Sequence, residues 1–302
     1  MRLTTNSFLI VFMCLILSNC KNEKKKTTSD SVTSNAAGKH QDLKDNLSLY
    51  ASFDNGVDAD FAKGDASMYS VTNRKERDSA KLGLDKEGVS IVNQEGYVGD
   101  ALKFTKRSKG YIYFKSKGNV SYSTANWEGT ISFWLSLDPE TDLEPGYCDP
   151  IQITDSGYND AGFWVDFTKE NPRDFRLGVI GDRISWNPNP EGPDNENPIF
   201  IEQLPVVKNP PFDTGKWTHV VITFKDLNTE NGQAALYLDG ALKGERKEIK
   251  DPFTWEVDQS NIYLGLGYIG LMDEISIFEK SLSSEQVGAL YTLKGGVKTL
   301  LD

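Results

Sequence analysis

The sequence predicts an all-β protein in which two antiparallel sheets pack face to face as a sandwich, with one short helix near the C-terminus. Three observations lead to this fold class. Short segments rich in β-branched and aromatic residues recur along most of the chain, bounded by Gly, Pro, Asn or Asp. Most of them alternate in character with a period of two, and only one good helical pattern is present. Many strands and few helices favour a sandwich, because each sheet must bury an apolar face.

Eight segments are predicted to be strands. They lie at residues 47–54, 110–115, 129–138, 162–168, 175–181, 216–225, 234–240 and 261–267. In the segment 162–168, alternation places Trp164 and Asp166 on one face and Phe163 on the other. The predicted helix begins after Ser283, which can cap it, and Gln286 is three residues further on, where it can complete a capping box.

The N-terminal segment 1–19 is typical of a secretory signal peptide. A positively charged start precedes an apolar run from Phe8 to Leu17, which is too short to span a bilayer. Cys20 follows directly, and this arrangement resembles the lipobox of bacterial lipoproteins. The resemblance implies that Cys20 becomes the lipidated N-terminus and anchors the protein to a membrane that the chain does not cross. An ordinary signal peptide with a chance cysteine is the alternative.

Residues 20–44 are predicted to be the lipidated cysteine and a disordered tether. They are polar, contain no aromatic residue and show no apolar period, so they cannot bury enough surface to offset the entropy of ordering. One domain is expected to fill residues 45–302, since β-sandwiches of this length commonly remain undivided. The predicted location is the bacterial cell envelope, at the outer membrane or the cell surface.

Charge and cysteine content exclude several classes of function. The formal net charge of −11 argues against a nucleic acid as partner, because phosphate binding depends on Lys and Arg contacts. Cys14 leaves with the signal peptide and Cys20 carries lipid, so Cys148 has no partner for a disulfide. His219 is the only histidine of the predicted domain, which excludes a zinc site built from several histidines.

Five segments together resemble a known family. They are GYVGDALKF (96–104), GTISFWLSL (129–137), GKWTHVVITF (215–224), ALYLDGALKG (235–244) and GLMDEISIFEKSLSSEQVGALY (270–291). Their order and approximate spacing are similar to those of laminin G-like domains of the concanavalin A-like lectin/glucanase superfamily. The resemblance covers nearly everything after residue 45 and implies a jelly-roll topology. It says much less about function, because that superfamily contains lectins, glycoside hydrolases, polysaccharide lyases and adhesion modules.

The last of these segments contains the acidic pair Asp273 and Glu274. Regular alternation predicts that the two carboxylates face opposite sides of a strand, Glu274 toward solvent, so they are not expected to form a catalytic dyad. Relatives of the resembled fold often hold one calcium where the first and last strands meet. This implies a structural Ca²⁺ site formed by Asp54 and Asp273, since calcium prefers oxygen ligands. The alternative is that Asp273 is satisfied by hydrogen bonds alone.

No catalytic residues are predicted. The Glu-x-Asp-x-x-Glu type of strand found in glycoside hydrolases of the resembled fold is absent, and Asp166 and Glu170 would lie roughly 13 Å apart along a strand. Glycosidase carboxyl pairs need about 5–9.5 Å. Lyases of the resembled fold use a Tyr and a His or Gln, with Arg and Asn neutralising a uronate. No such motif is found, but the abundant tyrosines keep a glycan-cleaving enzyme open as an alternative.

A carbohydrate-binding site is predicted around the insertion 184–215, because long loops on a rigid scaffold often carry function. Trp186 at its start could offer an exposed indole to the C–H groups of a sugar, or could instead pin the loop to the sandwich. The other predicted binding residues combine aromatic rings with polar groups: Tyr158, Asn159, Asp160 and Trp164. The expected function is non-catalytic recognition of a polysaccharide or oligosaccharide, and a protein-adhesion module is a further alternative.

Overall fold

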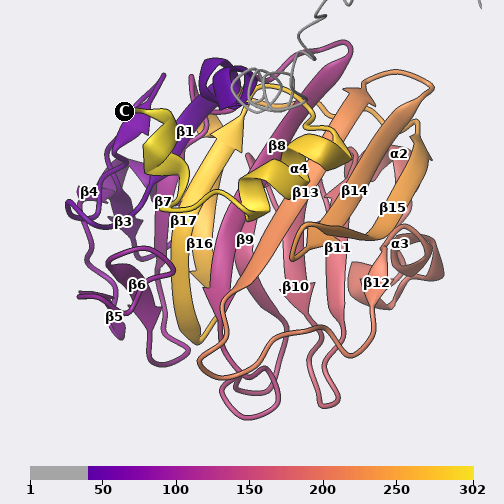
Figure 1. Cartoon of the computed structure of the whole chain (residues 1–302). Coiled ribbons are helices and arrows are strands. Elements are labelled where there is room, and N and C mark those ends of the chain that lie inside the picture. The colour runs from indigo at the N-terminus through magenta and orange to yellow at the C-terminus, as the bar shows by residue number, and fades with distance from the viewer. Residues whose placement is uncertain (1–39) are drawn as a thin grey trace, which may run out of the picture. The chain divides into compact units, whose positions relative to one another are not determined.

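The computed structural model describes residues 40–302, which form two packed antiparallel sheets (Figure 1). The predicted signal peptide, Cys20 and most of the tether lie outside the described residues. The last residues of the predicted tether differ from expectation, because residues 40–46 are helical and the side chain of Leu43 is fully buried in an apolar cluster. Within residues 40–302, no helix has both the length and the apolar character needed to cross a bilayer.

The first sheet has nine strands. Its order is β15-β14-β13-β8-β17-β1-β2, with β6 paired to β17 and β5 paired to β6. The strands are β1 (Leu47–Ala51), β2 (Phe61–Ala62), β5 (Val89–Val92), β6 (Ala101–Phe104), β8 (Trp127–Ser136), β13 (Thr218–Leu227), β14 (Gly232–Leu238), β15 (Ala241–Ile249) and β17 (Gly270–Phe278). The first and last strands of the sandwich, β1 and β17, lie side by side in antiparallel register.

The second sheet has eight strands in the order β12-β11-β10-β9-β16-β7-β3-β4. These are β3 (Tyr69–Val71), β4 (Lys81–Leu82), β7 (Tyr111–Lys115), β9 (Cys148–Thr154), β10 (Gly162–Phe167), β11 (Phe175–Ile180), β12 (Val206–Val207) and β16 (Asn261–Leu266). Strands β9 to β12 follow one another in the chain and lie side by side, whereas β16 pairs with β9 and β7, which are more than a hundred residues away in the sequence.

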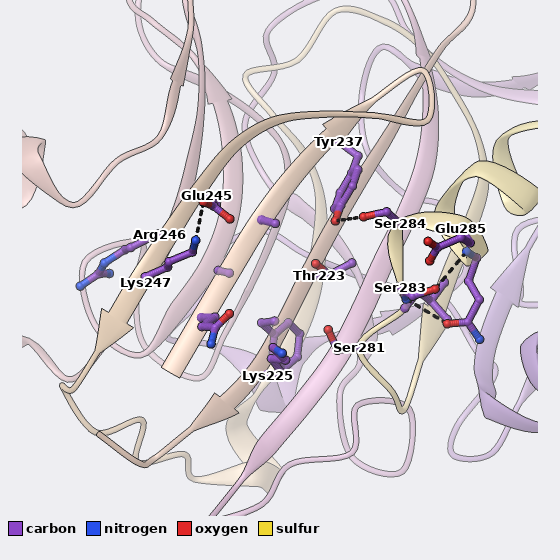
Figure 2. Close-up of a pocket in the computed structure, with 16 residues that line it drawn as sticks. Thr223, Lys225, Tyr237, Glu245, Arg246, Lys247, Ser281, Ser283, Ser284 and Glu285 are labelled. Carbon is purple, nitrogen blue, oxygen red and sulfur yellow. Dashed lines mark hydrogen bonds and ion pairs between the residues drawn. The ribbon is translucent and has the colours of Figure 1, made fainter. Parts of the chain in front are cut away.

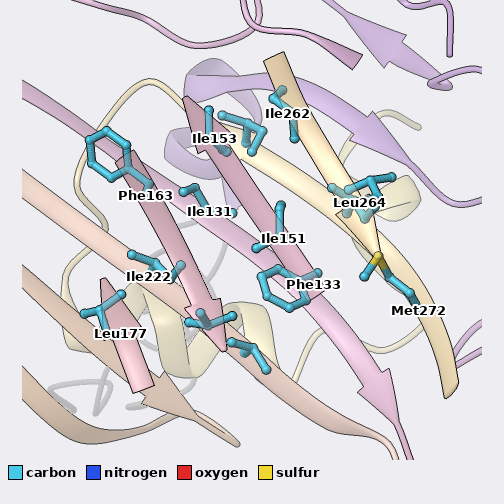
Figure 3. Close-up of a cluster of buried hydrophobic side chains, with 14 of the residues drawn as sticks. Ile131, Phe133, Ile151, Ile153, Phe163, Leu177, Ile222, Ile262, Leu264 and Met272 are labelled. Carbon is cyan, nitrogen blue, oxygen red and sulfur yellow. The ribbon is translucent and has the colours of Figure 1, made fainter. Parts of the chain in front are cut away.

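The core lies between the two sheets (Figure 3). Ile131 and Phe133 of β8 face Ile151 of β9 and Phe163 of β10 across this layer, and all four side chains are almost completely buried. Such close packing of β-branched and aromatic side chains is what alternation along the strands predicts. The predicted two-sheet sandwich is therefore confirmed.

Short helices cover the edges and the outside of the sandwich. They are α2 (Arg183–Trp186), α3 (Pro198–Glu202), α4 (Ser284–Tyr291) and four 3₁₀ turns, η1 (Arg77–Ser79), η2 (Asp194–Glu196), η3 (Val257–Gln259) and η4 (Val297–Leu300). The predicted capping box of α4 is confirmed, since Ser283 and Gln286 bond to each other's backbone N–H. Val287 and Leu290 then pack on Tyr50 at the outer face of the nine-stranded sheet. Figure 1 shows α4 lying across this face.

All eight predicted strands are present, and several others were not predicted. The most important of these is β9, which contains Pro150. A proline argues against a central strand because it cannot donate a ladder hydrogen bond. In the structure the register between β9 and β10 is irregular beside Pro150, where Val165 pairs with Ile151 but Phe167 with Cys148. This irregularity accommodates the proline and lies beside Asp149.

Candidate ligand-binding site

A pocket of about 140 Å³ lies on the outer face of the eight-stranded sheet. Its floor comes from β9, β10 and β11, and its wall from the loops that precede β10 and follow α2. The lining residues are Tyr147, Asp149, Tyr158, Trp164, Asp166, Arg176, Asn195 and Phe200. Four of these eight side chains are aromatic and three others are ionisable, so the pocket combines flat apolar surfaces with strong hydrogen-bonding groups.

Alternation along β10 positions the floor of this pocket. Phe163 lies in the core, whereas Trp164 belongs to a separate cluster outside the sheet, as the sequence predicted. The indole of Trp164 lies flat over Gly178 of β11, where an added Cβ would lie only 2.0 Å from the ring. A glycine at position 178 is therefore required for the indole to cover the neighbouring strand.

Asp166 and Arg176 form a buried ion pair across the floor. They are direct cross-strand partners in β10 and β11. Arg176 Nε donates to Asp166 Oδ1 at 2.8 Å and Nη2 donates to Oδ2, so the contact is bidentate. The guanidinium also lies over the ring of Tyr147, 4.8 Å from its centroid. Bidentate geometry and stacking hold Arg176 in one orientation.

Asp149 is the other carboxyl group of the pocket, and it is partly exposed. Its Oδ2 accepts a hydrogen bond from Gln152 Nε2 at 2.8 Å, and Gln152 Oε1 accepts from Arg74 Nη1 at 2.7 Å. Desolvation and the negative charge of Asp166 raise the pKa of Asp149 to about 8. At neutral pH this carboxyl group is therefore mostly protonated, and it can donate as well as accept hydrogen bonds.

A row of side chains continues from the pocket across the sheet. Trp164 pairs with Gln152, Gln152 with Tyr263, Tyr263 with Tyr113, and Tyr113 with Tyr69, so these side chains share the outer face. Tyr113 and Tyr263 are buried, and the guanidinium of Arg74 lies 4.0 Å above the Tyr263 ring. Beyond the pocket, the side chains of this row and Arg74 therefore largely bury one another.

The structure brings two of the five predicted binding residues, Tyr158 and Trp164, into this pocket. The prediction of an exposed indole at Trp186 is wrong. Trp186 is only 6% exposed and packs against Phe200, and its Nε1 donates to the carbonyl of Asn159 at 3.2 Å. Trp186 fixes its loop to the sandwich, which was the alternative, because an indole can be buried where its N–H finds a partner.

Asn159 and Asp160 support the wall of the pocket from behind. Asn159 Nδ2 donates to the buried carboxylate of Asp194, and the backbone N–H of Arg183 donates to Asp160 Oδ1 at 2.8 Å. Asp194 also accepts from Arg183 Nε at 2.6 Å and Asn187 Nδ2 at 2.6 Å. Burial opposes ionisation of Asp194, but these donors outweigh it and lower its pKa. The carboxylate therefore ties three loop segments together.

Sequence reasoning missed Tyr147, Asp149 and Arg176. Asp149 lies at the start of the unpredicted strand β9 and Tyr147 just before it, so no pattern assigned them to a face. Arg176 lies in a predicted strand, and its pairing with Asp166 could have been found only from the register between two strands.

The acidic pair Asp273 and Glu274 differs from its prediction. A bulge in β17 opposite β8 breaks the alternation, and Glu274 has a left-handed φ of 54°. Met272 and Ile275 both face the core, while the two carboxylates between them are buried beneath the outer face. Glu274 is thus not exposed to solvent: it accepts hydrogen bonds from the Tyr50 hydroxyl and from Val297 N at 2.6 Å. The expectation of opposite faces fails because alternation does not survive a bulge.

Asp54 and Asp273 both accept hydrogen bonds from the backbone of the loop 96–100. Asp54 Oδ1 accepts from Asp100 N at 2.8 Å, and Asp273 Oδ2 accepts from Val98 N at 3.0 Å. Lys298 Nζ lies 3.0 Å from Asp54 Oδ2. Burial, followed by the nearby carboxylates, raises the pKa of Asp273 to about 8 despite its hydrogen bonds.

Carboxylate oxygens are ligands that calcium prefers, but two carboxylates are too few to complete its coordination. Calcium takes about 6–8 oxygen ligands, and within residues 40–302 no group of three or more His, Cys, Asp or Glu side chains is arranged to hold a metal ion. A complete site would need backbone carbonyl groups or water. Backbone hydrogen bonds only partly offset the burial of Asp273, while Lys298 supplies a positive charge beside Asp54.

Ser132 and His219 form a hydrogen-bonded pair on the nine-stranded sheet, with 2.9 Å between Oγ and Nε2. His219 is buried, and desolvation lowers its pKa to about 3. In the part of the chain that the structure describes, its Nδ1 has no hydrogen-bond partner. A hydrolytic triad needs an accessible hydroxyl and a group that orients the imidazole, so this pair is a structural contact.

A second, wider groove of about 470 Å³ lies on the outer face of the nine-stranded sheet beside α4 (Figure 2). Its polar groups are largely paired with one another. Glu245 bonds to Lys247 at 2.7 Å, the Tyr237 hydroxyl to Ser284 at 3.1 Å, and Ser283 to the helix backbone. The pocket on the eight-stranded sheet is the better candidate, because it is smaller, more aromatic and contains a carboxyl group without a directly bonded cation.

Comparisons with known proteins agree with this fold. The laminin G-like family model described as the concanavalin A-like lectin/glucanases superfamily matches residues 106–288, more than half of the chain. No curated protein matches the sequence.

Several solved structures are similar. The receptor-binding domain of botulinum neurotoxin C/D mosaic has a TM-score of 0.52 and 17% identity, covering 82% of this chain and 51% of its own. The serotype D ligand-binding domain, solved with N-acetylneuraminic acid, has a TM-score of 0.51 and 14% identity, covering 84% and 52%. Domain 4 of AbnA, a GH43 arabinanase of Geobacillus stearothermophilus solved with arabinotriose, has a TM-score of 0.48 and 18% identity, covering 80% and 98%. The chain spans about half of the toxin domains, and its likeness to these two domains shows the fold alone.

Proposed function

The chain belongs to the concanavalin A-like lectin/glucanases superfamily, and from this premise we propose that it is a carbohydrate-binding module. The site is the pocket between Tyr147, Trp164 and Asn195 on the eight-stranded sheet. One observation carries the proposal: this pocket joins aromatic rings to hydrogen-bonding groups that remain partly exposed. Sugar rings present C–H faces to aromatic side chains and hydroxyl groups to polar ones, so this mixture suits them.

The size of the pocket limits what it can hold. Its volume of about 140 Å³ is below the roughly 300–1,000 Å³ of typical small-molecule sites. We therefore expect one sugar unit in the pocket, with the rest of a glycan extending into solvent. A neighbour of the same fold was solved with a single sugar, N-acetylneuraminic acid. That likeness makes the fold compatible with sugar binding.

A glycan array followed by calorimetric titration tests this function. With a responding oligosaccharide, we expect Tyr147→Ala and Asn195→Ala each to weaken binding at least tenfold, which corresponds to about 1.4 kcal/mol. Two matched variants serve as controls: Tyr97→Ala on the opposite sheet, and Asn189→Ala in the exposed part of the same loop. All variants should melt close to the parent. No binding to any glycan, or equal loss in the control variants, would refute the proposed site.

A glycan-cleaving enzyme is the second candidate, and one observation favours it. Asp149 and Asp166 lie in one pocket, and their environments differ: Asp149 is mostly protonated at neutral pH, while Asp166 is paired with Arg176. Two carboxyl groups with separate protonation states are typical of glycosidases. Both oxygens of Asp166 are occupied by Arg176, however, so binding is the better reading. Release of reducing ends from a polysaccharide panel, lost in Asp149→Asn, would favour the enzyme.

We also propose that lipid on Cys20 anchors this module to the bacterial cell envelope. The support is the apolar segment before Cys20 and the polar segment after it. Cys20→Ser should move the protein from the membrane fraction to the soluble fraction, and the parent should incorporate a labelled fatty acid. A parent protein that takes up no label would contradict this part of the proposal.

A further inference from the structure

The pocket holds one more carboxyl group than it has cations. Asp166 and Arg176 neutralise each other through two hydrogen bonds. Asp149 receives its hydrogen bond from the neutral amide of Gln152, and Arg74 bonds to the other end of that amide. A carboxyl group without a directly bonded cation, next to a second carboxylate, is destabilised in its ionised form. Its raised pKa agrees with this arrangement.

The same pocket is rich in aromatic surface. Tyr147, Tyr158, Trp164 and Phe200 make up half of its lining. Arg176 already lies 4.8 Å from the centroid of Tyr147 and 5.8 Å from that of Trp164, so these rings already attract one cation. Aromatic rings beside a carboxylate are the arrangement by which proteins recognise organic ammonium groups.

We propose that the pocket binds an organic ammonium group, whose positive charge pairs with Asp149 while Tyr147 and Tyr158 contact the carbon atoms bonded to nitrogen. The inference rests on the proposed function, since it uses the same pocket and names the ligand class: a glycan that carries an amino sugar with a free amine. A choline headgroup has the same chemistry. The small volume suits either group, because only one compact cationic unit has to enter.

Two matched pairs of probes test whether the ligand must carry a positive charge. Choline and 3,3-dimethyl-1-butanol have nearly the same shape, but only choline is charged. Glucosamine and N-acetylglucosamine differ in whether the nitrogen can be protonated. At low salt, we expect the cationic member of at least one pair to bind tenfold or more tightly by calorimetric titration. Binding of glucosamine alone identifies an amino sugar, and binding of choline alone identifies a headgroup. Equal affinity within both pairs, or binding to neither, overturns the inference.

Asp149→Asn separates this inference from the proposed function. It keeps the shape of the side chain and the contact with Gln152, but it cannot ionise, whereas Asp149 can release its proton to solvent and become a carboxylate when a cation binds beside it. We expect it to lower the affinity for the cationic member of a probe pair at least tenfold more than the affinity for its neutral partner. Asp258→Asn, at an exposed carboxylate outside the pocket, is the matched control and should leave both affinities unchanged. Neutral glycans that bind while Asp149→Asn leaves cation binding intact would overturn the ammonium inference and leave the carbohydrate site standing.

Discussion

The two outer faces of the sandwich carry similar groups, but on one face their carboxyl groups are bonded within the fold, and on the other face one carboxyl group remains partly exposed. Each has a pair of carboxyl groups next to aromatic rings: Asp149 and Asp166 on the eight-stranded sheet, and Asp273 and Glu274 on the nine-stranded sheet. On the nine-stranded sheet, the carboxyl groups accept backbone N–H groups from loops and from the C-terminal turn. On the eight-stranded sheet, Asp149 remains partly exposed in an open pocket.

This difference separates scaffold from site better than residue type does. Carboxylates that receive backbone hydrogen bonds have completed their partners within the fold, and they serve the structure. A carboxyl group that keeps an accessible oxygen in a pocket can still accept a ligand. The same logic separates Trp186, whose N–H donates to the Asn159 carbonyl in the neighbouring β9–β10 loop, from Tyr147, which remains partly exposed.

The largest expected effect concerns the buried ion pair between Asp166 and Arg176 on the eight-stranded sheet. Arg176→Met should lower the free energy of unfolding by about 3–5 kcal/mol, because it leaves Asp166 buried without its cation. Urea denaturation measures the change. The double variant Asp166→Leu, Arg176→Met should recover much of the loss, and Lys117→Met, at an exposed ion pair, should have little effect. A single variant as stable as the parent would show that this pair does not hold the pocket floor.

The second prediction concerns the calcium site expected at Asp54 and Asp273, on the nine-stranded sheet. If Asp54 and Asp273 bind calcium, the ion should stabilise the fold by about 2.7 kcal/mol at 100 times its dissociation constant. Thermal melts with calcium and with chelator measure this, and Asp273→Asn should abolish the difference. Lys298→Met should enlarge it, because Lys298 supplies the competing positive charge beside Asp54. Identical melts under both conditions in the parent would leave Asp273 as a hydrogen-bonded structural carboxyl group.

The third prediction is that the stability of the fold depends on pH through Asp149, in the pocket on the eight-stranded sheet. The folded pKa of Asp149 is about 8, above the ordinary value of 3.8, so the folded state binds this proton more tightly than the unfolded chain. The resulting stability is complete at low pH and is lost as the pH rises through about 8. Asp149→Asn should remove this loss, on the order of 2 kcal/mol after allowance for partial exposure. The facing groups are Asp166, Gln152, Arg74 and Arg176.

Denaturation of parent and variant across this pH range provides the measurement, because their difference reports the titration of Asp149 together with its effect on the neighbouring Asp166. Equal pH slopes for the two proteins would mean that Asp149 is solvated in the folded state. The pocket would then lack the uncompensated carboxyl group on which the ammonium inference depends.

The smallest expected effect concerns the helix that covers the nine-stranded sheet. Ser283→Ala should cost about 1 kcal/mol, because it removes the side-chain acceptor of the capping box. Chemical denaturation should detect this loss, and ligand binding at the other sheet should not change. Loss of binding in this variant would indicate that the two faces are coupled.

The eight strands and the capped helix could be predicted from the sequence because their signals are local. A period of two marks which face of a strand is buried, and this placed Trp164 and Asp166 together correctly. Ser283 and Gln286 stand three residues apart in the chain, so their capping box needs no distant contact.

The candidate site could be predicted only in part. Tyr158 and Trp164 were chosen because aromatic residues near a long loop are a general signal of binding, and both line the pocket. Trp186 met the same criterion but is buried, since Phe200 of the same insertion folds back over it. Whether an indole is exposed depends on what packs against it, and the local sequence does not contain that information.

By itself, the sequence determined the all-β class, the positions of eight strands and the capped helix, because periodicity and turn residues act over a few positions. Tertiary structure alone decided which carboxyl groups remain available. The bulge at Asp273 and Glu274 arises from pairing with β8 and β1, which are more than a hundred residues away. The contact between Asp166 and Arg176 arises from the register of two strands. Pairing across a sheet sets these positions, and pairing is a property of the whole folded chain.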